Sequence, residues 1–177
     1  MHKEFIIAGF GGQGILFTGK LLAYTGMKND YTVSWLPSYG PEMRGGTANC
    51  SVIVSDEMIG SPLVTEATEA IIMNGPSFDK FENVVAPGGT LFYDSSLVSN
   101  KHSRTDIKYI GIPATQIATD MGMRNLANMV LIGKVIEDTK IYTFEQVYEA
   151  LKGLVPKSKP QLFDSNKQAI ETGRTAE

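Results

Sequence analysis

A glycine-rich turn near the amino terminus places the strongest constraint on the fold of this chain. Residues 3–8 form a near-continuous apolar run of the kind found in a strand that is buried on both faces. Gly9, Gly11 and Gly14 follow at the spacing G-x-G-x-x-G, and residues 15–28 carry apolar side chains at helical spacing. A strand, a tight glycine turn and a helix in this order are typical of the start of a parallel α/β sheet.

The rest of the chain continues this alternation, and its 177 residues are enough for one domain with a sizeable core. The loop at 37–46 is too short for a helical crossover, so we expect an antiparallel or mixed region of the sheet at the strand after it. The pattern predicts an α/β, Rossmann-like three-layer domain over 1–177 with a largely parallel, partly mixed sheet. Within this domain, residues 156–177 are expected to form a C-terminal helical extension that packs loosely or lies against a partner. The further predicted strands are 31–36, 47–55, 70–74, 90–93 and 107–112. The further predicted helices are 77–82, 113–121, 125–138, 143–154 and one after Pro160. A turn is predicted at Pro87-Gly88-Gly89, before the strand at 90–93.

The glycine turn lacks the other marks of a dinucleotide site. Its backbone amides and the helix N-terminus that follows suit an anion such as phosphate. A dinucleotide fold also needs Asp or Glu at the end of the second strand to hold the ribose, and residues 33–37 contain neither. A nucleoside-triphosphate loop needs Gly-Lys-Ser/Thr, but Ile15 and Leu16 follow Gly14. The turn is therefore either an anion cradle or a turn that only tightens the packing of strand and helix.

A second glycine-rich loop, 38–46, is expected at the same edge of the sheet because it also follows a parallel strand. Arg44, which precedes Gly45, would then face the anion held by the amides of residues 12–14, since a planar guanidinium suits phosphate. In the alternative, Arg44 is a surface residue paired with Glu42.

Composition excludes several classes of function. A formal net charge of −3 argues against general nucleic-acid binding, which needs a concentrated basic surface. The single cysteine, Cys50, and the histidines His2 and His102 are too few for an iron–sulfur or zinc site. We expect Cys50 to be a small buried hydrophobe. Without a signal-peptide pattern or a run of about 18 apolar residues, the chain is expected in the cytoplasm and not in a membrane.

Three blocks of sequence together resemble one family. They are 9–14 (GFGGQG), 38–47 (SYGPEMRGGT) and 127–133 (ANMVLIG), and they occur in the order found in the gamma subunit of 2-oxoacid:ferredoxin (acceptor) oxidoreductases. The resemblance extends over essentially the whole chain. The second block is most similar to the 2-oxoglutarate-specific type.

The resemblance implies a subunit without catalytic residues of its own. In that family, alpha and beta subunits bind thiamine diphosphate, and iron–sulfur clusters lie on beta or delta subunits. Electrons pass to ferredoxin or a similar acceptor, and the gamma domain contributes to coenzyme A binding at the subunit junction. Carried over by position, the coenzyme A contacts would come from Gly11, Gly12, Gln13, Gly14, Arg44, Gly45 and Asn128, with Asn125 as a weaker candidate. Asn128 could instead serve in capping or at an interface.

Two alternatives stay open at this point. A gamma subunit of a pyruvate or branched-chain 2-oxoacid oxidoreductase would carry a similar sequence, because the keto-acid pocket lies mainly in other subunits. A stand-alone Rossmann-like protein that binds a nucleotide or phosphate is the alternative from another class. The isolated chain could form a homodimer through apolar surface that its partners would otherwise cover.

Overall fold

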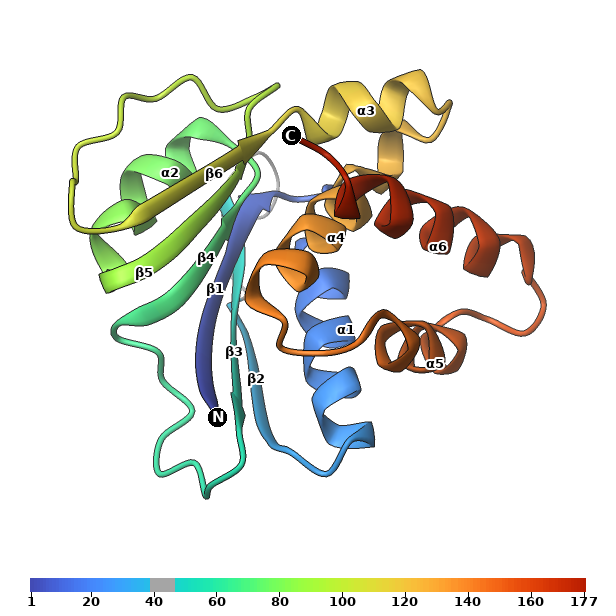
Figure 1. Ribbon diagram of the computed structural model, residues 1–177, viewed down its shortest axis with the longest axis horizontal. Coiled ribbons are helices and arrows are strands. Elements are labelled where there is room, and N and C mark those ends of the chain that lie inside the picture. The colour runs from blue at the N-terminus through green and yellow to red at the C-terminus, as the bar shows by residue number, and fades with distance from the viewer. Residues whose placement is uncertain (39–46) are drawn as a thin grey trace.

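The computed structural model describes residues 1–38 and 47–177, and Figure 1 shows their arrangement. Six strands of the described chain form one sheet in the order β2-β3-β1-β4-β5-β6. The strands are β1 (His2–Phe10), β2 (Thr32–Ser38), β3 (Thr47–Ser55), β4 (Ala67–Ile72), β5 (Val85–Asp94) and β6 (Lys108–Ile112). The helices are α1 (Ile15–Lys28), α2 (Gly75–Phe81), α3 (Ala114–Asp120), α4 (Ala127–Thr139), α5 (Phe144–Leu154) and α6 (Gln161–Arg174), with short 3-10 turns η2 (Glu82–Val84) and η3 (Arg124–Leu126).

The sheet is largely parallel, as predicted. β1, β4, β5 and β6 pair in parallel, whereas β3 pairs antiparallel with both β1 and β2. The short connection between β2 and β3 explains this reversal, because a parallel pairing needs a crossover of a dozen or more residues. The predicted α/β architecture with one mixed region is confirmed.

The helices cover the two faces of the sheet unequally (Figure 1). α1, α3, α4, α5 and α6 lie on one side, where the larger apolar core includes Phe5, Ile7 and Phe92. α2 and the connection between β5 and β6 lie on the other side, over a smaller core that includes Phe78 and Leu91. The result is a three-layer domain in which one outer layer is much thicker than the other.

The predicted turn at Pro87-Gly88-Gly89 is wrong, because these residues lie inside β5. Ala67 of β4 pairs with Val85 and Glu69 pairs with Thr90, so the register shifts between the two pairs and the extra residues bulge out of the ladder. A bulge of this kind accommodates proline and glycine, which a regular central strand does not. The strand therefore begins five residues earlier than the predicted 90–93.

The C-terminal helix is not loosely packed. Ala169 and Ile170 of α6 are fully buried against the rest of the molecule. A Cβ added to Gly173 of α6 would overlap the carbonyl oxygen of Val130 in α4, and one added to Gly133 of α4 would overlap that of Ile170. Glycines that face each other's helix backbone let α4 and α6 approach closely, which explains the tight packing.

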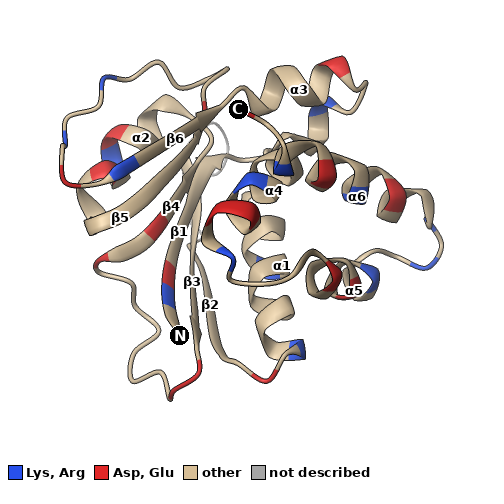
Figure 2. Ribbon diagram, in the orientation of Figure 1, with Lys and Arg blue, Asp and Glu red and all other residues tan. Residues whose placement is uncertain are grey.

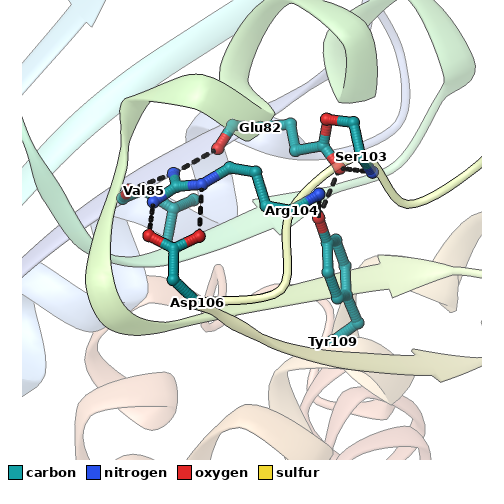
Figure 3. A network of polar contacts seen from close by, with 6 residues as sticks. All are labelled: Glu82, Val85, Ser103, Arg104, Asp106 and Tyr109. Atoms are coloured by element: carbon teal, nitrogen blue, oxygen red, sulfur yellow. Dashed lines mark hydrogen bonds and ion pairs between the residues drawn. The ribbon is translucent and has the colours of Figure 1, made fainter.

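A polar network holds the connection between β5 and β6 against the thin side of the molecule (Figure 3). The carboxylate of Glu82 accepts hydrogen bonds from the backbone N–H and hydroxyl of Ser103 and from the Tyr109 hydroxyl. The Arg104 guanidinium donates to the carbonyl oxygens of Glu82 (3.1 Å) and Val85 (2.5 Å) and forms a bidentate pair with Asp106 (2.9 and 2.6 Å). Glu82 is 5% exposed, so these bonds satisfy a buried carboxylate at the start of η2 and attach to it the irregular segment around Ser103.

Candidate functional site

The carboxyl ends of the parallel strands create the main candidate site. β1, β2, β4, β5 and β6 run in one direction and therefore end at the same edge of the sheet. The chain leaves β1 into α1 on one face and leaves β4 into α2 on the other (Figure 1). β1 and β4 are neighbours, so their connections diverge at a topological switch point, which is where open α/β sheets bind ligands.

The glycine turn lies at this switch point. Gly12 (φ 92°) and Gly14 (φ 77°) have left-handed backbone conformations, which side-chain-bearing residues rarely adopt. Nothing lies within 4 Å of the position that a Cβ of Gly12 would take, so the turn is open at this residue.

Gln13 closes the turn from inside. Its side-chain oxygen accepts a hydrogen bond from the backbone N–H of Phe10 (2.6 Å), and its side-chain nitrogen donates to the carbonyl oxygen of Met73 (3.0 Å). These bonds tie the turn after β1 to the end of β4. The side chain of Gln13 is therefore used within the protein, and its predicted contact with a ligand stays a prediction.

Helix α1 begins at the turn without a side-chain cap. Its N-cap residue is Gly14, which has no side chain to accept from the first helical amides. No acidic residue stands in the first turn either. The first amides of α1 and the positive end of the helix dipole therefore have no capping side chain, and the predicted binding of an anion there stays a prediction.

Asn128 connects the start of α4 to the start of α1. Its side-chain nitrogen donates to the carbonyl oxygen of Gly14 (3.3 Å) and to the hydroxyl of Thr18 (3.1 Å). The residue is 4% exposed, and its side-chain oxygen has no hydrogen-bond partner among the described residues. Two helix N-termini therefore meet beside the glycine turn. The predicted contact of Asn128 with a ligand stays a prediction, while its role between the helices is evident from these bonds.

A cleft of about 190 Å³ opens between the glycine turn and the segment that leads into α4. Arg124 and Asn125 line it together with Gly12, and both residues are exposed. Arg124 forms no ion pair with any described residue, so its charge is available at the cleft. The remaining lining residues are Gln13, Met73, Leu97, Thr115 and Ala127.

Sequence reasoning missed Arg124 as a site residue. Its position beside the glycine turn depends on how α3 and α4 cross the carboxyl edge of the sheet, which periodicity does not reveal. Its place just before the block 127–133 was the available signal. Charged residues are otherwise spread over the molecule in the view of Figure 2, where they form no continuous basic stripe.

Arg44 and Gly45 lie outside the described residues. The described residues that flank their loop, Ser38 and Thr47, are at the carboxyl edge, because Thr47 pairs with Phe10 at the end of β1. The predicted contact of Arg44 with an anion stays a prediction.

Asp94 is a buried carboxylate at the same edge, where it has a structural role. It ends β5 and is fully buried. It accepts hydrogen bonds from the backbone N–H of Thr115 (3.1 Å), from the Thr115 hydroxyl (2.5 Å) and from the backbone N–H of Ser96 (3.0 Å). These bonds anchor the start of α3 to the sheet and occupy the carboxylate.

Neither a metal centre nor a reactive thiol is indicated within 1–38 and 47–177. No group of three or more His, Cys, Asp or Glu side chains in these ranges could hold a metal ion. Cys50 is fully buried, as predicted, and its thiol approaches the carbonyl oxygen of Ile15 (3.7 Å). Burial raises the pKa of the Cys50 thiol to about 12, which keeps it protonated at neutral pH. No described helix is long and apolar enough to cross a membrane.

Comparison with known proteins identifies the family. Residues 4–176 match the family model for pyruvate ferredoxin/flavodoxin oxidoreductase. The 2-oxoglutarate synthase subunit KorC of Methanothermobacter marburgensis is 35% identical over 98% of this chain and 96% of its own length. The ketoisovalerate oxidoreductase subunit VorA of Methanothermobacter thermautotrophicus is 36% identical over 94% of this chain, which spans 35% of that relative's length.

A solved structure agrees with these relatives. The gamma subunit of a keto/oxoacid ferredoxin oxidoreductase from Geobacter sulfurreducens superposes with a TM-score of 0.84 at 25% sequence identity. The match covers 98% of this chain and 94% of the gamma subunit, so the two correspond over nearly their whole lengths. The chain therefore belongs to the pyruvate ferredoxin/flavodoxin oxidoreductase family, and it corresponds in extent to a gamma subunit of that family.

Proposed function

We propose that this chain is the gamma subunit of a 2-oxoglutarate:ferredoxin (acceptor) oxidoreductase and contributes to coenzyme A binding and to assembly in it. The complex would convert 2-oxoglutarate and coenzyme A to succinyl-CoA and CO2 and pass the electrons to ferredoxin or a similar acceptor. The match to KorC over nearly the full length of both chains favours 2-oxoglutarate. The whole of 1–177 is proposed to act as one gamma domain, with α6 as its C-terminal helical extension.

The observation that carries the coenzyme A proposal is the meeting of α1 and α4 beside the glycine turn. Both helices begin there, joined by Asn128 and Gly14, and Arg124 lines the adjoining cleft. Two helix N-termini and a guanidinium attract a multiply charged anion such as the pyrophosphate or 3′-phosphate of coenzyme A. Arg44 is proposed as a second cation at this anion.

The chemistry itself is assigned to partner subunits. The described part of the carboxyl edge presents no activated nucleophile and no acid–base pair, because Asp94 is occupied by hydrogen bonds and Cys50 is buried. Thiamine diphosphate, which stabilises a carbanion during decarboxylation, is proposed to bind to the alpha and beta subunits. Iron–sulfur clusters, which need several cysteine ligands, do not fit a chain with one buried cysteine and are proposed on the beta or a delta subunit. We propose the cytoplasm as the location of this complex.

The second candidate is a gamma subunit for a branched-chain 2-oxoacid. The 36% identity to the ketoisovalerate subunit favours it, although that relative is about three times as long as the aligned region. Pyruvate is a further alternative. The keto-acid pocket is expected mainly in other subunits, so the residues of this chain do not decide between the acids.

Co-purification from the native host tests the function. An affinity tag on this chain should retain larger subunits that contain thiamine diphosphate and reduce ferredoxin when coenzyme A is present. With equal concentrations of 2-oxoglutarate, 3-methyl-2-oxobutanoate and pyruvate, the proposal expects the highest kcat/KM for 2-oxoglutarate. A higher kcat/KM for another acid would change the proposed substrate, but the chain would still be assigned as a gamma subunit. Recovery of the chain as a stable monomer that binds NAD tightly would instead favour the stand-alone binding protein.

A further inference from the structure

A second cavity adjoins the same two helix starts. It has a volume of about 250 Å³ and lies between the first turn of α1, the start of α4 and the segment that joins α5 to α6. Gly14 is among its lining residues, and Asn125 lines both this cavity and the cleft that contains Arg124. The cavity and the proposed phosphate site are therefore contiguous.

Apolar side chains form most of the wall of this cavity. Phe17 of α1, Leu126 before α4, Leu154 at the end of α5 and Leu162 in the first turn of α6 line it. Leu162 is 36% exposed, so one large apolar side chain of this lining is also in contact with solvent. Four separate segments of the chain supply these side chains, and the aromatic ring of Phe17 is among them.

Asparagine side chains supply the polar groups of the cavity. Asn125 is exposed, whereas Asn128 and Asn166 are 4% and 7% exposed. Asn166 uses its side-chain nitrogen to donate to the carbonyl oxygen of Leu162 (2.7 Å), and Asn128 uses its nitrogen at Gly14. The side-chain oxygens of these residues form no hydrogen bond with described residues, so the polar part of the cavity is neutral and rich in acceptors.

We infer that this cavity holds the adenine ring of coenzyme A. The inference rests on the proposed function and adds to it the position of the base. Amide side chains pair with the donor and acceptor edge of adenine, and aromatic and branched apolar side chains pack against its faces. A neutral, apolar cavity next to an anion site matches the two ends of a nucleotide. The phosphates would lie at Gly14 and Arg124, and the base would lie against the apolar lining that includes Leu162.

The alternative part of coenzyme A, its pantetheine arm, fits the cavity less well. The thiol at the end of that arm must reach the acyl group that forms on the partner subunits, because this chain is proposed to carry no reacting group. The arm must therefore leave the chain. A nucleotide held at Gly14 and Leu162 lets it do so, whereas an arm buried between α1 and α6 does not.

Competition by fragments of coenzyme A tests the inference on the unaltered complex. The assembled oxidoreductase is assayed with 2-oxoglutarate, and inhibition against coenzyme A is measured for adenosine 3′,5′-bisphosphate and for ribose 3,5-bisphosphate, which lacks the base. The adenosine compound should inhibit at a concentration lower by about tenfold or more, the effect of one well-stacked base. Equal inhibition by both compounds would overturn the inference.

A variant that fills the cavity identifies where the base binds. In the Leu162→Trp complex, the inhibition constant of adenosine 3′,5′-bisphosphate should rise about tenfold or more, because the indole occupies the space of the base. The constant of the ribose compound should stay unchanged. Leu63→Trp is the matched control, since Leu63 is 63% exposed in the connection between β3 and β4 and does not line the cavity.

The remaining outcomes separate the inference from the proposed function. Two results together would overturn the adenine site and keep the proposed function. In Leu162→Trp the inhibition constant of adenosine 3′,5′-bisphosphate would be unchanged, and in Arg124→Gln the KM for coenzyme A would be raised. Loss of subunit association in Leu162→Trp, with the remaining complex inhibited normally, would make the cavity an interface and overturn the inference. A complex that forms product without coenzyme A would overturn the proposed function itself.

Discussion

The side-chain amide of Asn128 donates to the carbonyl oxygen of Gly14 (3.3 Å), and this contact, with the bond to Thr18, joins the first turns of α1 and α4. The contact is possible because Gly14 has no side chain: a Cβ at this position would overlap the Asn128 amide. The glycine of the fingerprint therefore has two functions. It adopts the left-handed conformation that the turn needs, and it leaves room for the neighbouring helix.

Alanine substitutions at two turn glycines should separate these functions. Gly12→Ala should lower the free energy of unfolding by about 1–2 kcal/mol, the cost of a left-handed backbone for a residue with a Cβ. Gly14→Ala carries the same cost and also displaces Asn128, so its loss should be larger by about 1–3 kcal/mol. Denaturant unfolding of both variants measures the difference. Equal losses would mean that the contact between α1 and α4 adjusts without cost.

The packing of α6 on α4 predicts a strong effect at Gly173. Gly173→Ala should destabilise the chain by about 1–3 kcal/mol or more, because the added methyl group overlaps the carbonyl oxygen of Val130, which belongs to the backbone of α4 and cannot rotate away. Gly60→Ala is the matched control. No atom lies within 4 Å of the Cβ position of Gly60, and its change should stay within about 0.5 kcal/mol. Similar unfolding midpoints for the two variants would contradict the close packing of the helices.

The sequence predicted the strands and helices best where periodicity alone decides them. The apolar run at 3–8 and the helical spacing at 15–28 led to β1 and α1, and the length of the loop at 37–46 led to the antiparallel β3. The start of β5 was missed because proline and glycine locally favour a turn. Pairing with β4 overrides that preference, and pairing depends on residues far along the chain.

The candidate site was predicted less completely than the fold. The glycine turn followed from local spacing, but the position of Arg124 and the contact between Asn128 and Gly14 depend on how α1 and α4 pack together. The close fit of α6 likewise depends on Gly133 and Gly173 facing opposite helices. Complementarity between distant surfaces leaves no periodic signal in one sequence. Arg44 and Gly45 lie outside the described residues, so their predicted contacts stay predictions.

The polar network at Glu82 predicts a dependence of stability on pH. Burial raises the pKa of Glu82, but the hydrogen bonds from Ser103 and Tyr109 together lower it more, so its pKa lies below the ordinary 4.5. The unfolded chain therefore binds more protons between the two values. The contribution of the ionised Glu82 carboxylate to the free energy of unfolding is therefore complete above pH 4.5, and it is lost as the pH falls through the folded-state pKa.

Glu82→Gln should remove this dependence. The amide of Gln has one acceptor oxygen in place of two and adds a donor N–H where Glu82 accepts, so at least one of these bonds is lost. The variant should therefore lose about 1–3 kcal/mol at pH 7, and less below the folded-state pKa of Glu82, where the native carboxyl group is protonated. Chemical unfolding from pH 7 to pH 3 measures both. Glu66→Gln, at an exposed residue, controls for the loss of one negative charge. Parallel curves for Glu82→Gln and the native chain would rule out the carboxylate as the source of the dependence.

The thiol of Cys50 should be unreactive in the folded chain. Its pKa of about 12 leaves almost no thiolate at pH 8, and its side chain is fully buried. A thiol-specific disulfide reagent should release its chromophore only after denaturant is added, with one equivalent per chain because the sequence has one cysteine. Fast labelling of the native chain would show that the region between β3 and α1 opens readily.

Arg124 should contribute to binding of coenzyme A and not of the keto acid. Its guanidinium lines the cleft at the glycine turn, where a charge-assisted bond to phosphate would form. In the assembled oxidoreductase, Arg124→Gln should raise the KM for coenzyme A by about tenfold, which corresponds to about 1.4 kcal/mol, and should leave the KM for 2-oxoglutarate unchanged. The difference from the native complex should shrink at high salt.

Two further variants make this measurement specific. Lys101→Gln removes an exposed cation from the connection between β5 and β6, away from the cleft, and should leave both KM values unchanged. Arg44→Ala should raise the KM for coenzyme A more than that for the keto acid, if both cations bind the same anion. An equal rise in both KM values for Arg124→Gln would instead indicate a general loss of assembly. An unchanged KM for coenzyme A in Arg124→Gln would mean that Arg124 is an exposed residue that does not bind coenzyme A.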